Sequence, residues 1–326
     1  MINQATARAH TNIALIKYWG KRDTKLILPQ TDSLSLTLDK FYTDTTVKFN
    51  DRLTTDRFSL DGHPQSGKSL AKVSQFLDIV RQKAGISTPA DVVSTNHVPT
   101  AAGLASSASA YAALASAAAK AAGLDLSRRD LSRLARRGSG SATRSIFGGL
   151  VEWHRGTDDR TSYAEPIDEH PNFGLAMTAI LLSTEKKKIS SRQGMQTVVE
   201  TSPFYPAWRS VVASDMARIK AAISEHDIDA IGRIAETNAM RMHALNLSAD
   251  PDFCYFNADT LRAFDVVHHL RATGVSCYYT MDAGPNVKVI YDRADWQPIH
   301  RELAQAFGAK RLVDCLAGPG VQWLDD

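Results

Sequence analysis

The chain has 326 residues, of which 44% are hydrophobic, and its formal net charge is +3. This length allows one large domain or two, and so small a charge does not favour nucleic acid as the main partner. No uncharged apolar run approaches the ~20 residues of a membrane span, the first residues lack a signal-peptide pattern, and three cysteines without metal-ligand spacing fit a reducing cytoplasm.

The first part of the chain is predicted to consist mainly of strands and turns. Residues 33–38 alternate apolar and polar positions, which predicts a half-buried strand. Residues 45–49 and 57–60 flank a polar turn and predict an antiparallel hairpin. Apolar residues on one face predict a helix over 69–83, and a strand over 91–95 follows it.

Residues 62–69 match the literal pattern of a nucleotide-binding P-loop, with Lys68 as its lysine. The strand before the match is short and polar, whereas P-loop strands lie in buried parallel sheets with near-continuous apolar runs. The predicted antiparallel hairpin upstream also suits a meander better than a βαβ unit. We therefore predict that Lys68 is not a phosphate-binding lysine.

A run of small residues over 99–110 opens into an alanine-rich helix over 111–122. Small side chains let a ligand approach the backbone closely, and free N–H groups at a helix start attract anions, most often phosphate. Hydroxyls at 106, 107 and 109 could also reach a phosphate or a Mg²⁺ ion. The alternative interpretation is an ordinary close-packed helix of small residues.

The rest of the chain alternates helices and strands. Ser127 with Asp130 predicts a helix start that runs to Gly138, residues 139–141 look like the start of another helix, and 173–183 predict a buried strand. The charged segment 184–188 is the predicted boundary between domains 1–184 and 185–326. Beyond it we expect helices near 207–224, 227–243, 257–272 and 295–307, and strands over 276–281 and 286–291.

Four further segments combine groups that bind anions with one isolated carboxylate. They are 17–22, where cations lie beside aromatic residues; 139–144, with hydroxyls and Arg144; a basic loop with Lys186, Lys187, Lys188 and Arg192; and the turn 281–286, which carries Asp282. Each segment alone could be a solvated surface or a plain turn. Their combination favours an enzyme that acts on a phosphorylated substrate.

Segments 12–23, 99–110, 138–149, 190–196 and 281–286 resemble, in order, the diphosphomevalonate decarboxylase family of the GHMP kinase superfamily. The resemblance implies a two-domain α+β fold of the GHMP kinase type, with mixed and antiparallel sheets packed with helices and an active site in the cleft between the domains. It also implies conversion of (R)-5-diphosphomevalonate to isopentenyl diphosphate with ATP and Mg²⁺, releasing ADP, phosphate and CO2, in a cytoplasmic homodimer.

The resemblance suggests a role for individual residues. Asp282 would take the proton of the tertiary hydroxyl, Arg144 would clamp the substrate carboxylate, and Lys17 would steady the transferring phosphoryl group or sit behind Asp282. The remaining substrate-binding residues would be Tyr18, Trp19, Gly20, Lys21, Lys72, Ser139, Gly140, Ser141, Ala142, Thr143 and Arg192. ATP would contact Ser94, Asn96, Pro99, Ala102, Gly103, Leu104, Ala105, Ser106, Ser107 and Lys187, with Ser107 also on the metal.

Several alternatives stay open at this level. A sister enzyme could act on 5-phosphomevalonate, or could phosphorylate the 3-hydroxyl without decarboxylation. A module that binds nucleic acid is allowed by the basic residues Arg128, Arg129, Arg133, Arg136 and Arg137, although no aromatic residues are interleaved with them. His268 and His269 are adjacent on a predicted helix and face different directions, which does not favour a metal site. The loop 185–194 is the predicted segment that closes on ATP.

Overall fold

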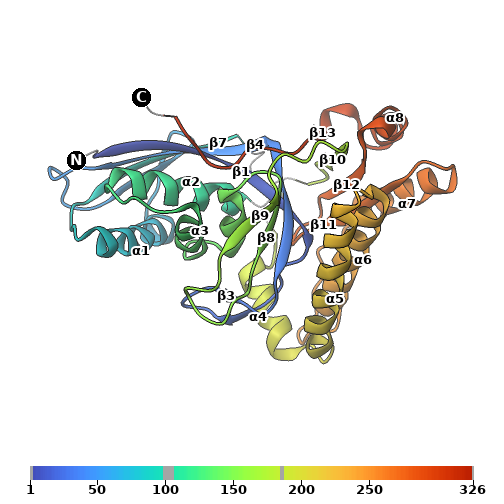
Figure 1. Ribbon diagram of the computed structural model, residues 1–326, viewed down its shortest axis with the longest axis horizontal. Helices are drawn as coiled ribbons and strands as arrows, with labels where there is room; N and C mark the ends of the chain where they lie inside the picture. The colour runs from blue at the N-terminus through green and yellow to red at the C-terminus, as the bar shows by residue number, and fades with distance from the viewer. Residues whose placement is uncertain (1–2, 98–105, 184–186, 325–326) are drawn as a thin grey trace.

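The computed structural model describes residues 3–97, 106–183 and 187–324 (Figure 1). The first sheet has the strand order β14-β1-β4-β7-β5-β6, and β8 extends from β4 to β9. A second sheet has the order β11-β12-β10-β13, and β2 pairs with β3. The strands are β1 Gln4–Ile16, β2 Lys21–Asp23, β3 Leu28–Pro29, β4 Ser33–Phe49, β5 Arg57–Leu60, β6 His63–Pro64, β7 Ala90–His97, β8 Leu150–Trp153, β9 Ala164–Asp168, β10 Leu175–Ile180, β11 Cys277–Met281, β12 Val287–Asp292, β13 Leu312–Cys315 and β14 Gln322–Trp323.

The helices gather in two groups, one with each sheet. In Figure 1, α1 to α3 lie along one face of the first sheet, and α5 to α8 accompany the second. Their bounds are α1 Gly67–Ala84, α2 Ser106–Ala121, α3 Arg128–Arg136, α4 Ser191–Thr201, α5 Tyr205–Ser224, α6 Ile228–Leu247, α7 Ala258–Ala272 and α8 Trp296–Phe307, with 3-10 turns η1 Gly140–Ile146, η2 Arg293–Asp295 and η3 Ala309–Arg311. The predicted α+β class is confirmed. Among the described residues, every helix is too short or too polar to traverse a lipid bilayer.

The long strands β1 and β4 contribute to both hydrophobic cores. The first half of β1 buries Ala5, Ala7 and Ala9 in the core that includes α2, where small side chains let the helix approach the sheet closely. The second half of β1 buries Ile13 and Leu15 in the core that also holds the second sheet. The end of β1 therefore lies where the two parts of the molecule meet.

The predicted hairpin of 45–49 with 57–60 is wrong. Strand β7 lies between the two segments, pairing antiparallel with β4 and parallel with β5. Val92 in β7 is directly opposite both Val47 and Phe58, so β7 takes the position between the two segments. Helix α1 lies in the connection between the parallel neighbours β5 and β7, which is the arrangement of a βαβ unit. The expected meander, which was one argument against the P-loop pattern, is therefore wrong as well.

Other boundaries differ in smaller ways. Helix α2 begins at Ser106 rather than 111, and 191–201 form α4, a helix that we did not predict. Strand β10 hydrogen-bonds with β12 and β13 in the second sheet, although the division at 184 assigns it to the first domain. The chain also returns at β14 to pair with β1. The boundary at 184 stays a prediction.

Several local predictions are confirmed by the structure. Ser127 caps α3 by accepting a hydrogen bond from the backbone N–H of Asp130. The apolar face of α1 buries Val73, Phe76, Leu77 and Val80 as its spacing indicated. Helices α5 to α8 and strands β11 and β12 lie where periodicity placed them, within a few residues at each end.

Candidate active site

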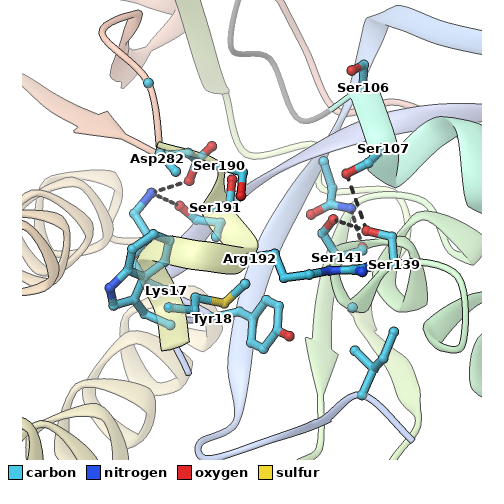
Figure 2. Close-up of a pocket in the computed structure, with 18 of the residues that line it drawn as sticks. Lys17, Tyr18, Ser106, Ser107, Ser139, Ser141, Ser190, Ser191, Arg192 and Asp282 are labelled. Atoms are coloured by element: carbon cyan, nitrogen blue, oxygen red, sulfur yellow. Dashed lines mark hydrogen bonds and ion pairs between the residues drawn. The ribbon is translucent and has the colours of Figure 1, made fainter. Parts of the chain in front are cut away.

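The end of β1 opens into a cavity of about 560 Å³ that both halves of the chain line. Its walls come from the segment after β1, the starts of α2, η1 and α4, and the turn between β11 and β12 (Figure 2). The predicted residues that line it are Lys17, Tyr18, Trp19, Lys21, Lys72, Ser106, Ser107, Ser139, Gly140, Ser141, Arg144, Lys187, Arg192 and Asp282. Folding thus brings together residues from all five segments that carry the family resemblance.

A buried ion pair stands at one end of this cavity. Nζ of Lys17 lies 2.9 Å from Oδ1 of Asp282 and also donates to the carbonyl of Ala14 at 2.7 Å. The Lys17 side chain is 1% exposed, whereas that of Asp282 is 22% exposed. The backbone N–H of Lys17 is held by Asn238 Oδ1 on α6. The lysine is therefore fixed behind the carboxylate, and the carboxylate faces the cavity.

Opposing effects set the protonation of this pair. Burial alone would raise the pKa of Asp282, but the positive charges of Lys17 and Lys288 outweigh it and lower that pKa below its ordinary value. Burial lowers the pKa of Lys17, and Asp282 opposes that change. The carboxylate is thus ionised at neutral pH and can accept a proton.

Arg144 lies in the wall of the cavity, 2% exposed and held by hydroxyl and amide oxygens. Nε donates to Ser35 Oγ at 2.9 Å, Nη1 to Ser33 Oγ at 2.5 Å and Nη2 to Asn12 Oδ1 at 3.1 Å. A guanidinium has five N–H groups, so among the described residues one N–H on each terminal nitrogen lacks a partner. Burial lowers the pKa of Arg144 to about 10, which leaves it positively charged.

Serine hydroxyls gather at the other end of the cavity, where two helices begin. Ser139 Oγ lies 3.3 Å from both Ser107 Oγ and Ser141 Oγ, as Figure 2 shows. Ser107 is in the first turn of α2, and Ser139 precedes η1. The N–H groups at the start of a helix generally suit an anion. The predicted contacts Pro99, Ala102, Gly103, Leu104 and Ala105 lie outside the described residues.

Comparisons with known proteins agree with this geometry. A model of the diphosphomevalonate decarboxylase-like N-terminal domain matches residues 9–164, and one of the mevalonate 5-diphosphate decarboxylase C-terminal domain matches 177–319. The chain belongs to the diphosphomevalonate decarboxylase family. The predicted resemblance is confirmed.

Individual relatives are similar over nearly the whole chain. The diphosphomevalonate decarboxylase of Ganoderma lucidum is 41% identical over 89% of this chain and 78% of its own length. The mevalonate diphosphate decarboxylase structure from Staphylococcus aureus is 48% identical, covers 100% of this chain and 99% of its own, and has a TM-score of 0.96. A structure described as MDDEF in complex with MVAPP, AMPPCP and magnesium is 50% identical over 99% of both chains, with a TM-score of 0.95.

In this decarboxylase-family chain, the cationic side chains of Lys21 and Arg192 line the middle of the cavity. Burial, with a smaller contribution from Arg192, lowers the pKa of Lys21 to about 8. The Tyr18 hydroxyl is buried and lacks a hydrogen-bond partner among the described residues. Its ring packs so closely on Gly140 that a Cβ there would lie 2.7 Å from it. Arg192, which we expected in a loop, projects from the first turn of α4 into the cavity (Figure 2).

A second cavity of about 380 Å³ adjoins the first at Lys72, Ser106, Ser107 and Tyr111. Ser94 and Asn96 line it together with apolar side chains such as Phe58, Val92 and Leu114. The predicted ATP contacts are therefore divided between the two cavities. Lys187 lies at the Asp282 end instead, where Nζ donates to the Ala283 carbonyl at 2.7 Å and to Ser191 Oγ at 3.0 Å. Its predicted contact with ATP stays a prediction.

Three residues predicted to bind substrate do not line the cavity. Ala142 and Thr143 are fully buried inside η1, where Thr143 Oγ1 donates to the Gly140 carbonyl. Gly20 has a φ of +120°, and a Cβ there would lie 1.8 Å from the Tyr205 hydroxyl. These residues shape the turns that place Ser141, Trp19 and Lys21, because a larger or differently placed side chain would not fit.

Sequence reasoning missed several residues of the site. Asn12 links β1 to η1, since its Nδ2 donates to the Ser141 carbonyl at 2.9 Å and to Ser145 Oγ at 2.7 Å. An asparagine within an apolar part of a strand was the available signal, because asparagine is depleted in strands. Tyr111, Ser190 and Ser191 also line the cavity. His243 lies behind the ion pair, where burial lowers its pKa to about 3, and no sequence pattern indicated it.

Four of the five basic residues near α3 have partners within the molecule. Arg133 and Arg136 both pair with Asp159, Arg128 pairs with Glu169, and the Arg129 guanidinium lies 3.6 Å from the centre of the Tyr163 ring. These internal partners weaken the alternative of a module that binds nucleic acid. Among the described residues, no group of three or more histidine, cysteine or acidic side chains could hold a metal ion.

Proposed function

We propose that this chain converts (R)-5-diphosphomevalonate to isopentenyl diphosphate with consumption of ATP. The observation that carries the proposal is the ionised Asp282, backed by Lys17, in a cavity whose other walls are cationic or rich in hydroxyls. Relatives named diphosphomevalonate decarboxylase support it, as does the neighbouring structure with MVAPP, AMPPCP and magnesium. Such a site offers one base and many anion donors, which is what this reaction requires.

The reaction has two stages. A tertiary hydroxyl is a poor leaving group, so its oxygen first attacks the γ-phosphorus of ATP, its proton passes to Asp282, and ADP departs. Phosphate then leaves with the C–O electron pair, and the tertiary carbon becomes positively charged. The carboxylate carbon leaves as CO2, and its former C–C electron pair forms the alkene. Asp282 returns its proton to solvent, which restores the enzyme.

Arg144 is proposed to hold the substrate carboxylate. Its two terminal nitrogens each keep a free N–H among the described residues, and this fork matches a carboxylate. Ser33, Ser35 and Asn12 fix the guanidinium from behind. A carboxylate held in this way stays aligned with the tertiary carbon until CO2 departs.

The diphosphate of the substrate and the phosphates of ATP are assigned to different walls of the cavity. Ser139, Gly140, Ser141, Tyr18, Lys21, Lys72 and Arg192 are proposed to bind the substrate diphosphate through hydroxyls, amides and cations. ATP is proposed to place its nucleoside in the second cavity beside Ser94 and Asn96, with its phosphates at the start of α2. Mg²⁺ prefers phosphate oxygens, one or two carboxylates and water, and the Ser107 hydroxyl at the start of α2 is the group proposed to contact it beside the ATP phosphates. When bound, the ion neutralises charge on the transferred phosphate.

Two further assignments rest on the family resemblance. We propose a homodimer, which sedimentation at several protein concentrations would test. We also propose a cytoplasmic location, which fits Cys254, Cys277 and Cys315, all of them free. The division of the chain near 184 is likewise proposed, and limited proteolysis there would test it.

The test is a coupled assay with purified protein, Mg²⁺-ATP and (R)-5-diphosphomevalonate. Equal amounts of ADP and CO2 support the proposal. The 5-monophosphate is assayed in parallel, because turnover of that substrate alone would move the chain to the sister activity. ADP without CO2 would indicate a 3-kinase, and no ADP from either substrate would refute the proposal.

A further inference from the structure

A second buried lysine lies next to the proposed base. Lys288 lies in β12 with its side chain 1% exposed. Lysines are almost never fully buried unless they are paired. Nζ of Lys288 donates to the Asn286 carbonyl at 3.1 Å and lies 3.9 Å from Oδ2 of Asp282. Burial lowers the pKa of Lys288 to about 8.

The two oxygens of Asp282 have different surroundings. Oδ1 accepts the hydrogen bond from Lys17, whereas Oδ2 is buried and has no hydrogen-bond partner among the described residues. Lys288 faces this second oxygen. A buried carboxylate oxygen without a compensating charge would be costly, so the ammonium group of Lys288 accounts for the position of Oδ2.

We propose that Lys288 is a positioning residue for the reaction, which holds Asp282 in one orientation from the side opposite to Lys17. This inference rests on the proposed function, because Lys288 acts only through Asp282. With Lys17 on Oδ1 and Lys288 facing Oδ2, rotation of the carboxylate would lose one of the two contacts. A fixed carboxylate presents the same atom to the substrate hydroxyl at each turnover, and such alignment governs the rate.

Other charged groups also surround Asp282 and must be kept constant in a test. Lys17 follows β1, Arg144 lies in η1, and both lower the pKa of Asp282. Lys187 precedes α4 and donates to Ala283. His243 on α6 has a pKa of about 3 and is neutral near pH 7. Since none of these is altered in a Lys288 variant, a change in pH dependence reports the charge of Lys288.

The test compares Lys288→Gln with Lys288→Arg and with Lys310→Gln, an exposed lysine on η3. Glutamine keeps a donor for the Asn286 carbonyl but removes the charge. We expect kcat to fall about 10- to 100-fold with KM for the diphosphate substrate nearly unchanged. Since loss of a nearby cation raises the pKa of a carboxylate, the acidic limb of the kcat profile should move up by about 1 to 3 pH units.

The controls separate positioning from folding. Lys288→Arg should restore the position of the acidic limb, and Lys310→Gln should match the wild type. Lys288→Met serves as a second uncharged variant if glutamine prevents folding, since methionine fills a similar volume and adapts to the shape of a buried site. An uncharged variant with wild-type kcat and an unmoved limb would overturn the proposal. A wild-type protein that releases neither ADP nor CO2 would instead refute the proposed function.

Discussion

Nζ of Lys17 lies 2.9 Å from Oδ1 of Asp282, although 265 positions separate the two residues in the chain. Lys17 follows the strand that passes through both cores, and Asp282 follows β11 in the second sheet. The ion pair thus forms only when the two parts of the molecule are assembled. The base that we propose is therefore complete only in the folded whole.

Asp282→Asn is predicted to abolish both products while the substrates still bind. An amide cannot take the hydroxyl proton, so we expect kcat to fall at least about 10²-fold. ADP and CO2 should decline together in a discontinuous assay, and calorimetry should still detect the diphosphate substrate. Asp252→Asn, at an exposed position, is the control. A variant that retains near-normal turnover would rule out this role.

Arg144→Lys is predicted to be far more harmful than an ordinary exchange of cations. Lysine cannot reproduce the fork or the contacts to Ser33, Ser35 and Asn12. We expect kcat/KM for the diphosphate substrate to fall about 10- to 100-fold. Arg209→Lys, on the exposed side of α5, should leave it unchanged. Comparable losses in the two variants would contradict a specific role for Arg144.

The pKa of Lys21 near 8 predicts a pH-dependent affinity for the diphosphate. Because burial lowers this pKa, the cation is present below about pH 8 and is lost as the pH rises through that value. KM for the substrate should therefore rise above pH 8. Lys21→Arg stays charged there and should flatten the rise. If this variant follows the wild-type profile, another group controls binding.

The P-loop match also gives a testable contrast. Lys68 is exposed at the start of α1 and lines only the second cavity, whereas Lys72 lines both. Lys68→Ala should leave KM for ATP nearly unchanged. Lys72→Ala should raise KM for the diphosphate substrate about tenfold, as expected for a lost contact to a charged group. A large loss of ATP use in the Lys68 variant would revive the P-loop interpretation.

The wall behind Tyr18 should matter for stability. Trp153 is fully buried, and its ring centre lies 4.7 Å from that of Tyr18. Trp153→Ala should lower the free energy of unfolding by about 3 to 5 kcal/mol, as measured in urea. Trp323→Ala removes a side chain that is 44% exposed and should lower it by clearly less, because less apolar surface is lost from the interior. Equal losses would mean that burial of Trp153 contributes little.

Much of the fold was predictable because local signals agree with it. Apolar spacing predicted α1 and the capping serine marked α3. The pairing of β5 was not predictable, since its choice between β4 and β7 depends on which strand occupies the centre of the sheet. Helix α4 was missed because its first turn contains serine and arginine rather than an apolar face.

The sequence also predicted part of the candidate site. Asp282, Lys17 and Arg144 lie together as the resemblance implied. Lys288 could not be identified from sequence, because a lysine in an apolar strand gives no indication of which carboxylate it faces. The position of Lys187 apart from Ser94 and Asn96 was not predictable for the same reason, since its contact with Ala283 joins segments far apart in the chain.

The most direct test of the account follows the substrate's 3-hydroxyl oxygen, labelled with a heavy isotope, through one turnover with Mg²⁺-ATP. If phosphorylation of that hydroxyl precedes the loss of CO2, the label must appear in the inorganic phosphate, in an amount equal to the ADP and CO2 formed. Label released into water would contradict the account, because the hydroxyl would then have departed without having been phosphorylated.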